Sequence, residues 1–298
     1  MRFGGRRSSE NVEFREGGGR GGGFGFGGGG GGGAGMLLGL VFSRFGIGGV
    51  VVVIAIMFLL GGDFGLGGGG QQAVAPQGRP AAAARNCQSE PTITFACQTL
   101  ASTEDQWSAL FQAAGQRYEA PKMVIFQGLD RSGCGTADSR MGPFYCPADR
   151  SIYLDIAFFR ELAQRFAAPG DFAQAYVVAH EVGHHIQTIT GGADRIRQAQ
   201  AAVGETQGNA LQVRMELQAD CYAGVWAARE RSAMEPGDLE EGMTAAAAIG
   251  DDTLQRATQG VVVPESFTHG TAAQRQEALM TGYRAGNPAA CDTYTRGI

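Results

Sequence analysis

Apolar residues recur every three to four positions over most of the second half of the chain, which is the spacing of helices that bury one face. The most regular stretch is FAQAYVVAHEVGHHIQTIT, which follows Asp171 and stops at Gly191-Gly192. Asp is a good N-cap, and Gly is common just beyond helix C-termini. Further helices are expected at about 102–118, 157–166, 206–231, 239–249 and 272–285, the last capped by Thr271.

Two short segments ahead of these helices have the pattern of strands. KMVIFQG, from Lys122 to Gly128, is apolar and partly β-branched. FYCPADRSIYLD, from Phe144 to Asp155, is typical of a hairpin with its turn at Pro147-Ala148-Asp149. The pattern therefore predicts an α+β domain that is mostly helical, with a small antiparallel sheet.

Glycine divides the chain unevenly, because 28 of its 49 glycines lie before residue 71. A Gly-rich run has no side chains to bury and loses much backbone entropy on ordering, so packed structure is not expected there. We therefore expect a disordered Gly/Arg-rich tail at 1–44, an apolar segment at 45–62, a flexible linker at 63–85 and a folded domain at 86–298.

The apolar segment FGIGGVVVVIAIMFLLGG holds 18 residues without a charge. As a helix it measures roughly 27 Å, close to the ~30 Å hydrocarbon core of a bilayer. A cleaved signal peptide and an uncleaved anchor both fit, but the 44 preceding residues favour a transmembrane anchor, because signal peptides total about 15–30 residues. Six arginines precede the segment. By the positive-inside rule, they predict a cytoplasmic N-terminus and a domain outside the cytoplasm.

The positions of the cysteines are also consistent with a domain outside the cytoplasm. All six follow the apolar segment: Cys87, Cys97, Cys134, Cys146, Cys221 and Cys291. An even number in an exported domain is typical of disulfides. Proximity favours the pairs 87–97 and 134–146 and leaves 221–291, with other pairings open. Unpaired buried thiols are the alternative, and they would fit a cytosolic domain instead.

The net charge of the predicted domain limits the kinds of partner that it can bind. After residue 70 the chain holds 18 Lys and Arg against 25 Asp and Glu. Nucleic-acid binding needs a basic face, so no nucleic-acid partner is expected. The oligomeric state is left open.

The motif that carries chemistry is His180-Glu181-Val182-Gly183-His184. Two histidines four residues apart on a helix share one face, where both rings can bind one zinc ion. Glu181 points about 100° away from His180 around the helix, so it suits a general base acting on water rather than a ligand. The alternative is a pair of solvated surface histidines.

A catalytic zinc site needs a third protein ligand. The extended HExxHxxGxxH pattern is absent, because Gln187 and Thr190 occupy its Gly and His positions. Glu216 on a downstream helix is the expected ligand, with Asp220 one turn later orienting a ligand histidine. Glu205 is the competing candidate.

Two further histidines have weaker signals. His269 is isolated in the sequence, and if it faces the metal it could donate a hydrogen bond to the developing oxyanion. His185 points away from the metal-binding face of its helix, so a core or hydrogen-bonding role is expected for it.

With these residues identified, the chain resembles a bacterial family of neutral zinc metallopeptidases over residues 1–10 and 36–298. The resemblance is carried by HEVGHH at 180–185 and ELQADC at 216–221. More broadly, the chain is similar to gluzincin peptidases. That similarity implies a zincin-like fold with His180, His184 and Glu216 as ligands of one Zn²⁺ per chain, and with Asp220 as the orienting residue.

The segment THGTAAQR, at 268–275, resembles the Thr-His-Pro…Arg stretch of membrane-bound CAAX-processing and heat-shock metallopeptidases. That likeness implies a catalytic, oxyanion-stabilising His269. Together with the predicted anchor, the family resemblance implies a single-pass protein of the bacterial inner membrane with a periplasmic catalytic domain.

We therefore expect a zinc-dependent endopeptidase that cleaves peptide or protein substrates, with Glu181 as its general base. The strand Ser151–Asp155 is expected at the edge of the sheet, where it could hold an extended peptide. Two alternatives stay open. One is a zinc hydrolase acting on a non-peptide substrate, and the other is a membrane-tethered zinc-binding scaffold without peptidase activity.

Overall fold

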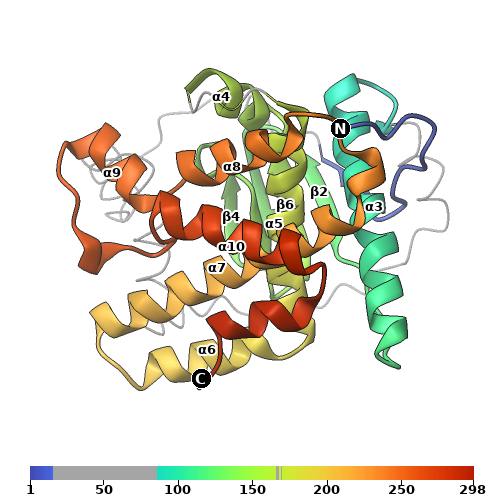
Figure 1. The fold of residues 1–298 in the computed structure, drawn as a ribbon. Helices are drawn as coiled ribbons and strands as arrows, with labels where there is room; N and C mark the ends of the chain where they lie inside the picture. The colour runs from blue at the N-terminus through green and yellow to red at the C-terminus, as the bar shows by residue number, and fades with distance from the viewer. Residues whose placement is uncertain (16–85, 166–167, 169) are drawn as a thin grey trace, which may run out of the picture.

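Helices make up most of the domain (Figure 1). The structure, a computed structural model, describes residues 1–15, 86–165, 168 and 170–298. Its α-helices are α3 (Pro91–Ala113), α4 (Ala157–Arg165), α5 (Asp171–Ile189), α6 (Gly192–Ala201), α7 (Glu205–Arg229), α8 (Asp238–Ala248), α9 (Asp251–Gln259) and α10 (Ala272–Ala285). The 3₁₀ helices are η1 (Ser139–Met141), η2 (Arg231–Ala233), η3 (Pro264–Ser266) and η4 (Pro288–Tyr294).

The described strands form two small sheets. They are β1 (Val12–Phe14), β2 (Lys122–Phe126), β3 (Leu129–Ser132), β4 (Gly135–Asp138), β5 (Phe144–Cys146) and β6 (Ser151–Asp155). The four-stranded sheet has the order β1-β2-β6-β5, and β3 and β4 form a separate antiparallel hairpin. In the larger sheet, β1 and β6 both run parallel to β2, and only β5 is antiparallel to its neighbour.

This topology corrects two predictions. The sheet is mixed rather than antiparallel, because β2 and β6 are buried neighbours in parallel register, with Val124 opposite Tyr153. Strands covered on both faces have continuous apolar runs, and β2 contains MVIF and β6 contains IYL. β6 is also an inner strand between β2 and β5, so it offers no free edge to a peptide.

Residues 1–15 were assigned to the disordered tail, and the structure instead places them on the domain. β1 extends the sheet beside β2, and Arg6 Nη1 lies 2.5 Å from the buried carboxylate of Glu230. The Ser9 hydroxyl donates to Glu104 Oε1 at 2.5 Å. Residues 1–15 therefore belong to the same folded domain as the described residues that follow residue 85. Residues 16–44 and the predicted linker lie outside the described residues.

The predicted transmembrane helix and membrane location also need correction. Within the described parts of the chain, no helix is both long enough and apolar enough to cross a membrane, and the predicted span at 45–62 lies outside them. Residues 1–15 pair with β2 of the domain, whereas a single crossing between them would put the two on opposite sides of a membrane. The single-pass arrangement with a cytoplasmic N-terminus and a periplasmic domain is therefore wrong.

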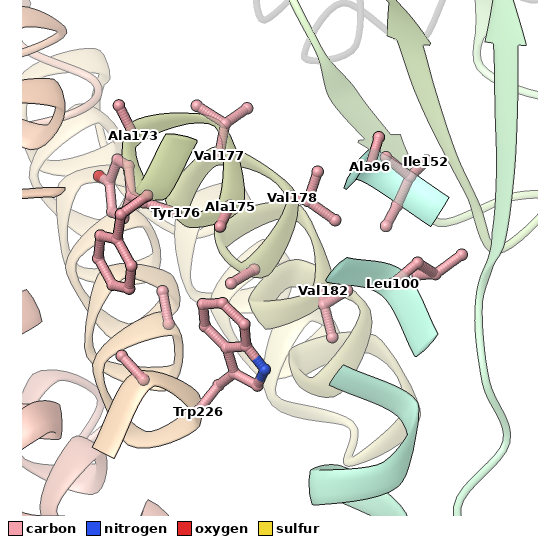
Figure 2. Packing of buried hydrophobic residues seen from close by; sticks show 14 of the residues in the cluster. Ala96, Leu100, Ile152, Ala173, Ala175, Tyr176, Val177, Val178, Val182 and Trp226 are labelled. Carbon is pink, nitrogen blue, oxygen red and sulfur yellow. The ribbon is translucent and has the colours of Figure 1, made fainter. Parts of the chain in front are cut away.

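α5, which carries the histidine motif, lies at the centre of the helical layer and contacts α3, α7 and α8. Nearly all its residues from Phe172 to Gly183 are buried. Figure 2 shows Val178 and Val182 of α5 pointing toward Leu100 of α3 and Ile152 of β6. A helix that is covered on every side holds its side chains in fixed positions, as a metal site requires.

Two glycines let the helices that carry the site approach closely. A Cβ on Gly183 of α5 would lie 2.8 Å from the Ala219 carbonyl oxygen of α7. A Cβ on Gly282 of α10 would lie 1.9 Å from the Cys221 carbonyl oxygen of α7. Only glycine fits at such crossings, and the result is that α7 lies tightly between α5 and α10.

All six cysteines are paired, in the three combinations that proximity favoured: Cys87–Cys97, Cys134–Cys146 and Cys221–Cys291. The third pair joins α7, close to the predicted metal ligand, to η4 at the end of the chain. It therefore fastens the C-terminal segment to the helix that carries Glu216.

Candidate metal centre

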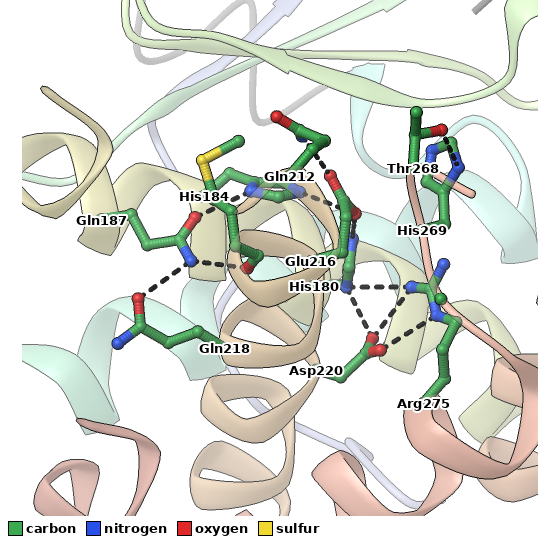
Figure 3. Close-up of polar contacts among 12 residues, drawn as sticks. His180, His184, Gln187, Gln212, Glu216, Gln218, Asp220, Thr268, His269 and Arg275 are labelled. Carbon is green, nitrogen blue, oxygen red and sulfur yellow. Dashed lines mark hydrogen bonds and ion pairs between the residues drawn. The ribbon is translucent and has the colours of Figure 1, made fainter. Parts of the chain in front are cut away.

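Three of the predicted site residues converge on one point (Figure 3). His180 and His184 lie one turn apart on α5, and Glu216 approaches them from α7. The Nε2 atoms of the two rings lie 3.2 and 3.4 Å from the same carboxylate oxygen, Oε2 of Glu216. The competing candidate, Glu205, is exposed at the first turn of α7 and is not part of this group.

The orientation of His180 is set by Asp220, one turn after Glu216. Its Nδ1 lies 2.8 Å from Oδ1 of Asp220, which is fully buried. A carboxylate accepts, so Nδ1 carries the hydrogen and Nε2 presents its lone pair to Glu216. The lone pair and the carboxylate oxygen would repel each other, so either a proton on Nε2 or a metal ion has to lie between them. Two imidazole nitrogens and one carboxylate oxygen are a donor set that suits zinc, so these residues fit the ion.

The pKa shifts of the three residues also favour a bound cation. Burial lowers the pKa of His180, but the charge of Asp220 and the hydrogen bonds that Asp220 and Glu216 accept from the ring outweigh it and raise the pKa to about 10. Glu216 likewise raises the pKa of His184 against the effect of burial. Burial alone would raise the pKa of Glu216, yet the two histidines hold it well below its ordinary value. The cluster therefore stabilises positive charge at its centre.

Asp220 itself is held by residues that the sequence analysis did not assign to the site. Arg275 of α10, fully buried, donates to both oxygens of Asp220 at 2.9 and 3.0 Å. The Tyr176 hydroxyl donates to Oδ1 at 2.6 Å. A signal for Arg275 was present, because it shares a helical face with the apolar Ala278 and Leu279, where a charged residue needs a buried partner.

Glu181 is buried beside the converging ligands without being one of them. Its charge contributes to the raised pKa of His184, which places it close to the centre. Its role as a general base stays a prediction.

His269 lies at the margin of the same site. In Figure 3 it lies beyond Glu216, on the side away from His184, and its charge contributes to the lowered pKa of Glu216. Its Nδ1 is 3.3 Å from Oδ1 of Asp251, the first residue of α9. The backbone N–H groups of Thr268, His269 and Gly270 donate to the other oxygen of Asp251 at 2.8, 2.6 and 2.9 Å. Sequence reasoning missed Asp251 because only the fold brings it to this loop.

His185 faces away from the candidate metal centre, as expected. Its Nε2 donates to the carbonyl oxygen of Glu119 at 2.6 Å, and its Nδ1 lies 3.1 Å from the Tyr145 hydroxyl. Burial, only partly opposed by the Glu119 carbonyl, lowers the pKa of His185 to about 4. The ring is therefore neutral in the folded protein at neutral pH.

We expect His185 to make folding sensitive to acid. Its pKa is about 4 when folded and about 6.5 when unfolded, so below pH 6.5 the unfolded chain binds the additional proton. The contribution to stability is complete above pH 6.5 and decreases as the pH falls toward 4. Between pH 7 and pH 5 the loss is about 2 kcal/mol. Urea unfolding of the metal-free protein and of His185→Gln at both pH values should show the larger pH dependence in the wild type; equal dependence would contradict the assignment.

A mostly helical domain in which a histidine pair on one helix meets a glutamate from a second helix has a candidate site for one zinc ion. Comparison of the sequence with known families agrees. The chain belongs to the family described as "Putative neutral zinc metallopeptidase", which matches residues 1–294, and the resemblance drawn from the motifs is thereby confirmed.

The chain has relatives in two different bacteria. It is 42% identical over 305 residues to the uncharacterized protein YpfJ of Escherichia coli K12, covering 100% of both chains. It is 43% identical over 213 residues to the uncharacterized protein Rv2575 of Mycobacterium tuberculosis H37Rv, covering 67% of this chain and 70% of the relative. No solved structure matches the chain.

Proposed function

We propose that this protein is a zinc-dependent endopeptidase whose ion is held by His180, His184 and Glu216. The observation that carries the proposal is the approach of both Nε2 atoms to one oxygen of Glu216, at 3.2 and 3.4 Å. Three protein donors leave a coordination position for water or substrate, as in catalytic rather than structural zinc sites. When bound, zinc supplies a Lewis acid that lowers the pKa of water and polarises the scissile carbonyl.

In this mechanism, three further residues transfer the proton, stabilise the oxyanion and orient a metal ligand. Glu181 accepts a proton from the attacking water on its carboxylate and passes it to the nitrogen of the leaving amine. His269 donates the hydrogen of Nε2 to the developing oxyanion, while its Nδ1 lies 3.1 Å from the Thr268 hydroxyl, which can donate to it. Asp220 keeps the hydrogen of His180 on Nδ1, so that Nε2 stays available to the metal.

The test separates a peptidase from the two alternatives. The zinc-loaded protein is incubated with an unfolded protein and, separately, with simple ester substrates, with and without a chelator. Zinc-dependent release of internal peptide fragments supports the proposal. Ester hydrolysis without peptide cleavage rejects it in favour of a non-peptide hydrolase, and tight zinc binding without either reaction rejects it in favour of a binding protein.

A further inference from the structure

His184, the second of the two converging histidines, has an orienting partner of its own. Gln187 lies three residues further along α5 and is only 1% exposed. Its Oε1 lies 2.9 Å from Nδ1 of His184. Its Nε2 donates to the carbonyl oxygen of Met215 at 2.7 Å and to Oε1 of Gln218 at 3.1 Å (Figure 3).

These contacts fix which end of the Gln187 amide faces the histidine. The Met215 carbonyl can only accept a hydrogen bond, so the NH₂ group must face it and the oxygen must face His184. An amide oxygen also only accepts, so Nδ1 of His184 carries the hydrogen. Nε2 then keeps its lone pair on the side where Glu216 lies, as metal binding requires.

The next residue in the chain of contacts prevents the Gln187 amide from turning round. Gln218 of α7 donates through its own Nε2 to the carbonyl oxygen of Cys291 at 3.3 Å and to the Thr295 hydroxyl at 2.9 Å. Its oxygen therefore faces Gln187. Cys291 is tied to α7 by its disulfide with Cys221, so the last acceptor of this series is fixed in place.

The two histidines are thus oriented by different chemistry. His180 faces the carboxylate of Asp220, whereas His184 faces a neutral amide. An amide orients the ring without adding negative charge to a cluster that already contains Glu216 and Asp220. Gln187 also occupies the position where the extended HExxHxxGxxH pattern has glycine, so this chain places an orienting side chain there.

We propose that Gln187 is a positioning residue that holds His184 with its hydrogen on Nδ1, through an amide series that runs from Gln187 through Gln218 to the carbonyl of Cys291. The inference rests on the metal site of the proposed function. It concerns metal binding alone, however, and makes no claim about what is hydrolysed.

The experiment compares Gln187→Leu with Gln187→Glu in full-length protein. Leu keeps the volume and removes the acceptor, whereas Glu keeps an oxygen facing His184. Loss of an orienting partner typically weakens metal binding by about 10–100-fold. We expect that loss in zinc affinity for Gln187→Leu, measured by competition with a chelating dye. Gln187→Glu should lose less, because its carboxylate still faces Nδ1 of His184 although it can no longer donate to Met215 and Gln218.

Nitrogen-15 spectra of the histidine rings in zinc-loaded protein report the tautomer directly. The wild type and Gln187→Glu should show a protected Nδ1–H on His184, and Gln187→Leu should lose that protection. Gln218→Leu, which removes the next link, should give a smaller change in the same direction. Gln276→Leu is the matched control, because Gln276 donates to the Met243 carbonyl between α10 and α8 without touching a histidine.

If Gln187 only filled space in the core, the two variants would rank in the opposite order of zinc affinity. A buried packing residue tolerates Leu better than the polar Glu, so a smaller effect for Leu overturns the proposal. So does an unchanged zinc affinity and an unchanged Nδ1–H signal in a folded Gln187→Leu protein. A wild type that binds zinc tightly with the expected tautomer but cleaves no peptide leaves this inference standing and rejects the proposed function alone.

Discussion

Glu181→Gln is expected to abolish hydrolysis while zinc stays bound. The donor atoms that converge come from His180, His184 and Glu216, so the substitution removes no ligand. Glutamine has nearly the same shape but cannot accept the proton of the attacking water at neutral pH. General-base catalysis contributes about 10²–10⁴-fold, and kcat should decrease by that factor. The measurement combines the rate of peptide cleavage with the zinc content of the purified variant.

Glu240→Gln provides the control for this substitution. Glu240 is exposed on α8, and its substitution also removes one negative charge, but from the surface rather than from the buried site. Cleavage and zinc content should therefore stay at wild-type levels. A Glu181→Gln enzyme that cleaves at the wild-type rate would contradict the assigned mechanism. A variant that loses its zinc would instead place Glu181 among the ligands.

The sequence predicts those parts of the site in which the residues lie close together on a single helix. His180 and His184 share a face because of their spacing, and α5 ends just before Gly191 as predicted. Its N-cap is Gly170 rather than Asp171, and no side chain caps that end. Glu216 and Asp220 were found because they repeat that spacing on a second helix. The capping box at Thr271 was likewise local, and it fixes the start of α10 where it was predicted.

The residues that were missed depend on contacts between distant segments. Asp251 lies 18 residues from His269, and Arg275 lies 55 residues from Asp220, so no spacing rule links either pair. The same limit explains β1, a three-residue strand whose backbone pairs with β2, a segment more than 100 residues away.

The start of α3 was misjudged for a similar reason. We placed it near Ser102, a residue type common at helix N-termini, but the helix begins at Pro91. Ser102 lies inside it, where its hydroxyl donates to Glu230 and accepts from the indole N–H of Trp226. A polar residue that is satisfied by tertiary partners looks, in the sequence, like a helix start.

The second large effect is expected for Arg275→Met, which should destabilise the folded protein by about 3–5 kcal/mol. The substitution removes the cation that binds both oxygens of the buried Asp220 carboxylate. Both Arg275 and Asp220 are almost inaccessible to solvent, with side-chain exposures of 2% and 0%. Burial raises the pKa of Asp220, and the charges of Arg275 and His180 reverse that and lower it. Chemical denaturation of the metal-free protein measures the effect without interference from zinc binding.

A double-mutant cycle shows whether that loss comes from the unpaired charge or from lost packing. If it comes from the charge, Asp220→Asn combined with Arg275→Met should be clearly more stable than Arg275→Met alone, because the stranded carboxylate is gone. If it comes from packing, the two losses should add. Arg284→Met on the same helix is the control, because Arg284 is 66% exposed and its ion pair with Glu277 is long, at 3.8 Å, so the change should cost at most about 1 kcal/mol. Additive losses in the cycle would show that Arg275 only fills space beside α7, and Asp220 would then hold His180 without help from α10.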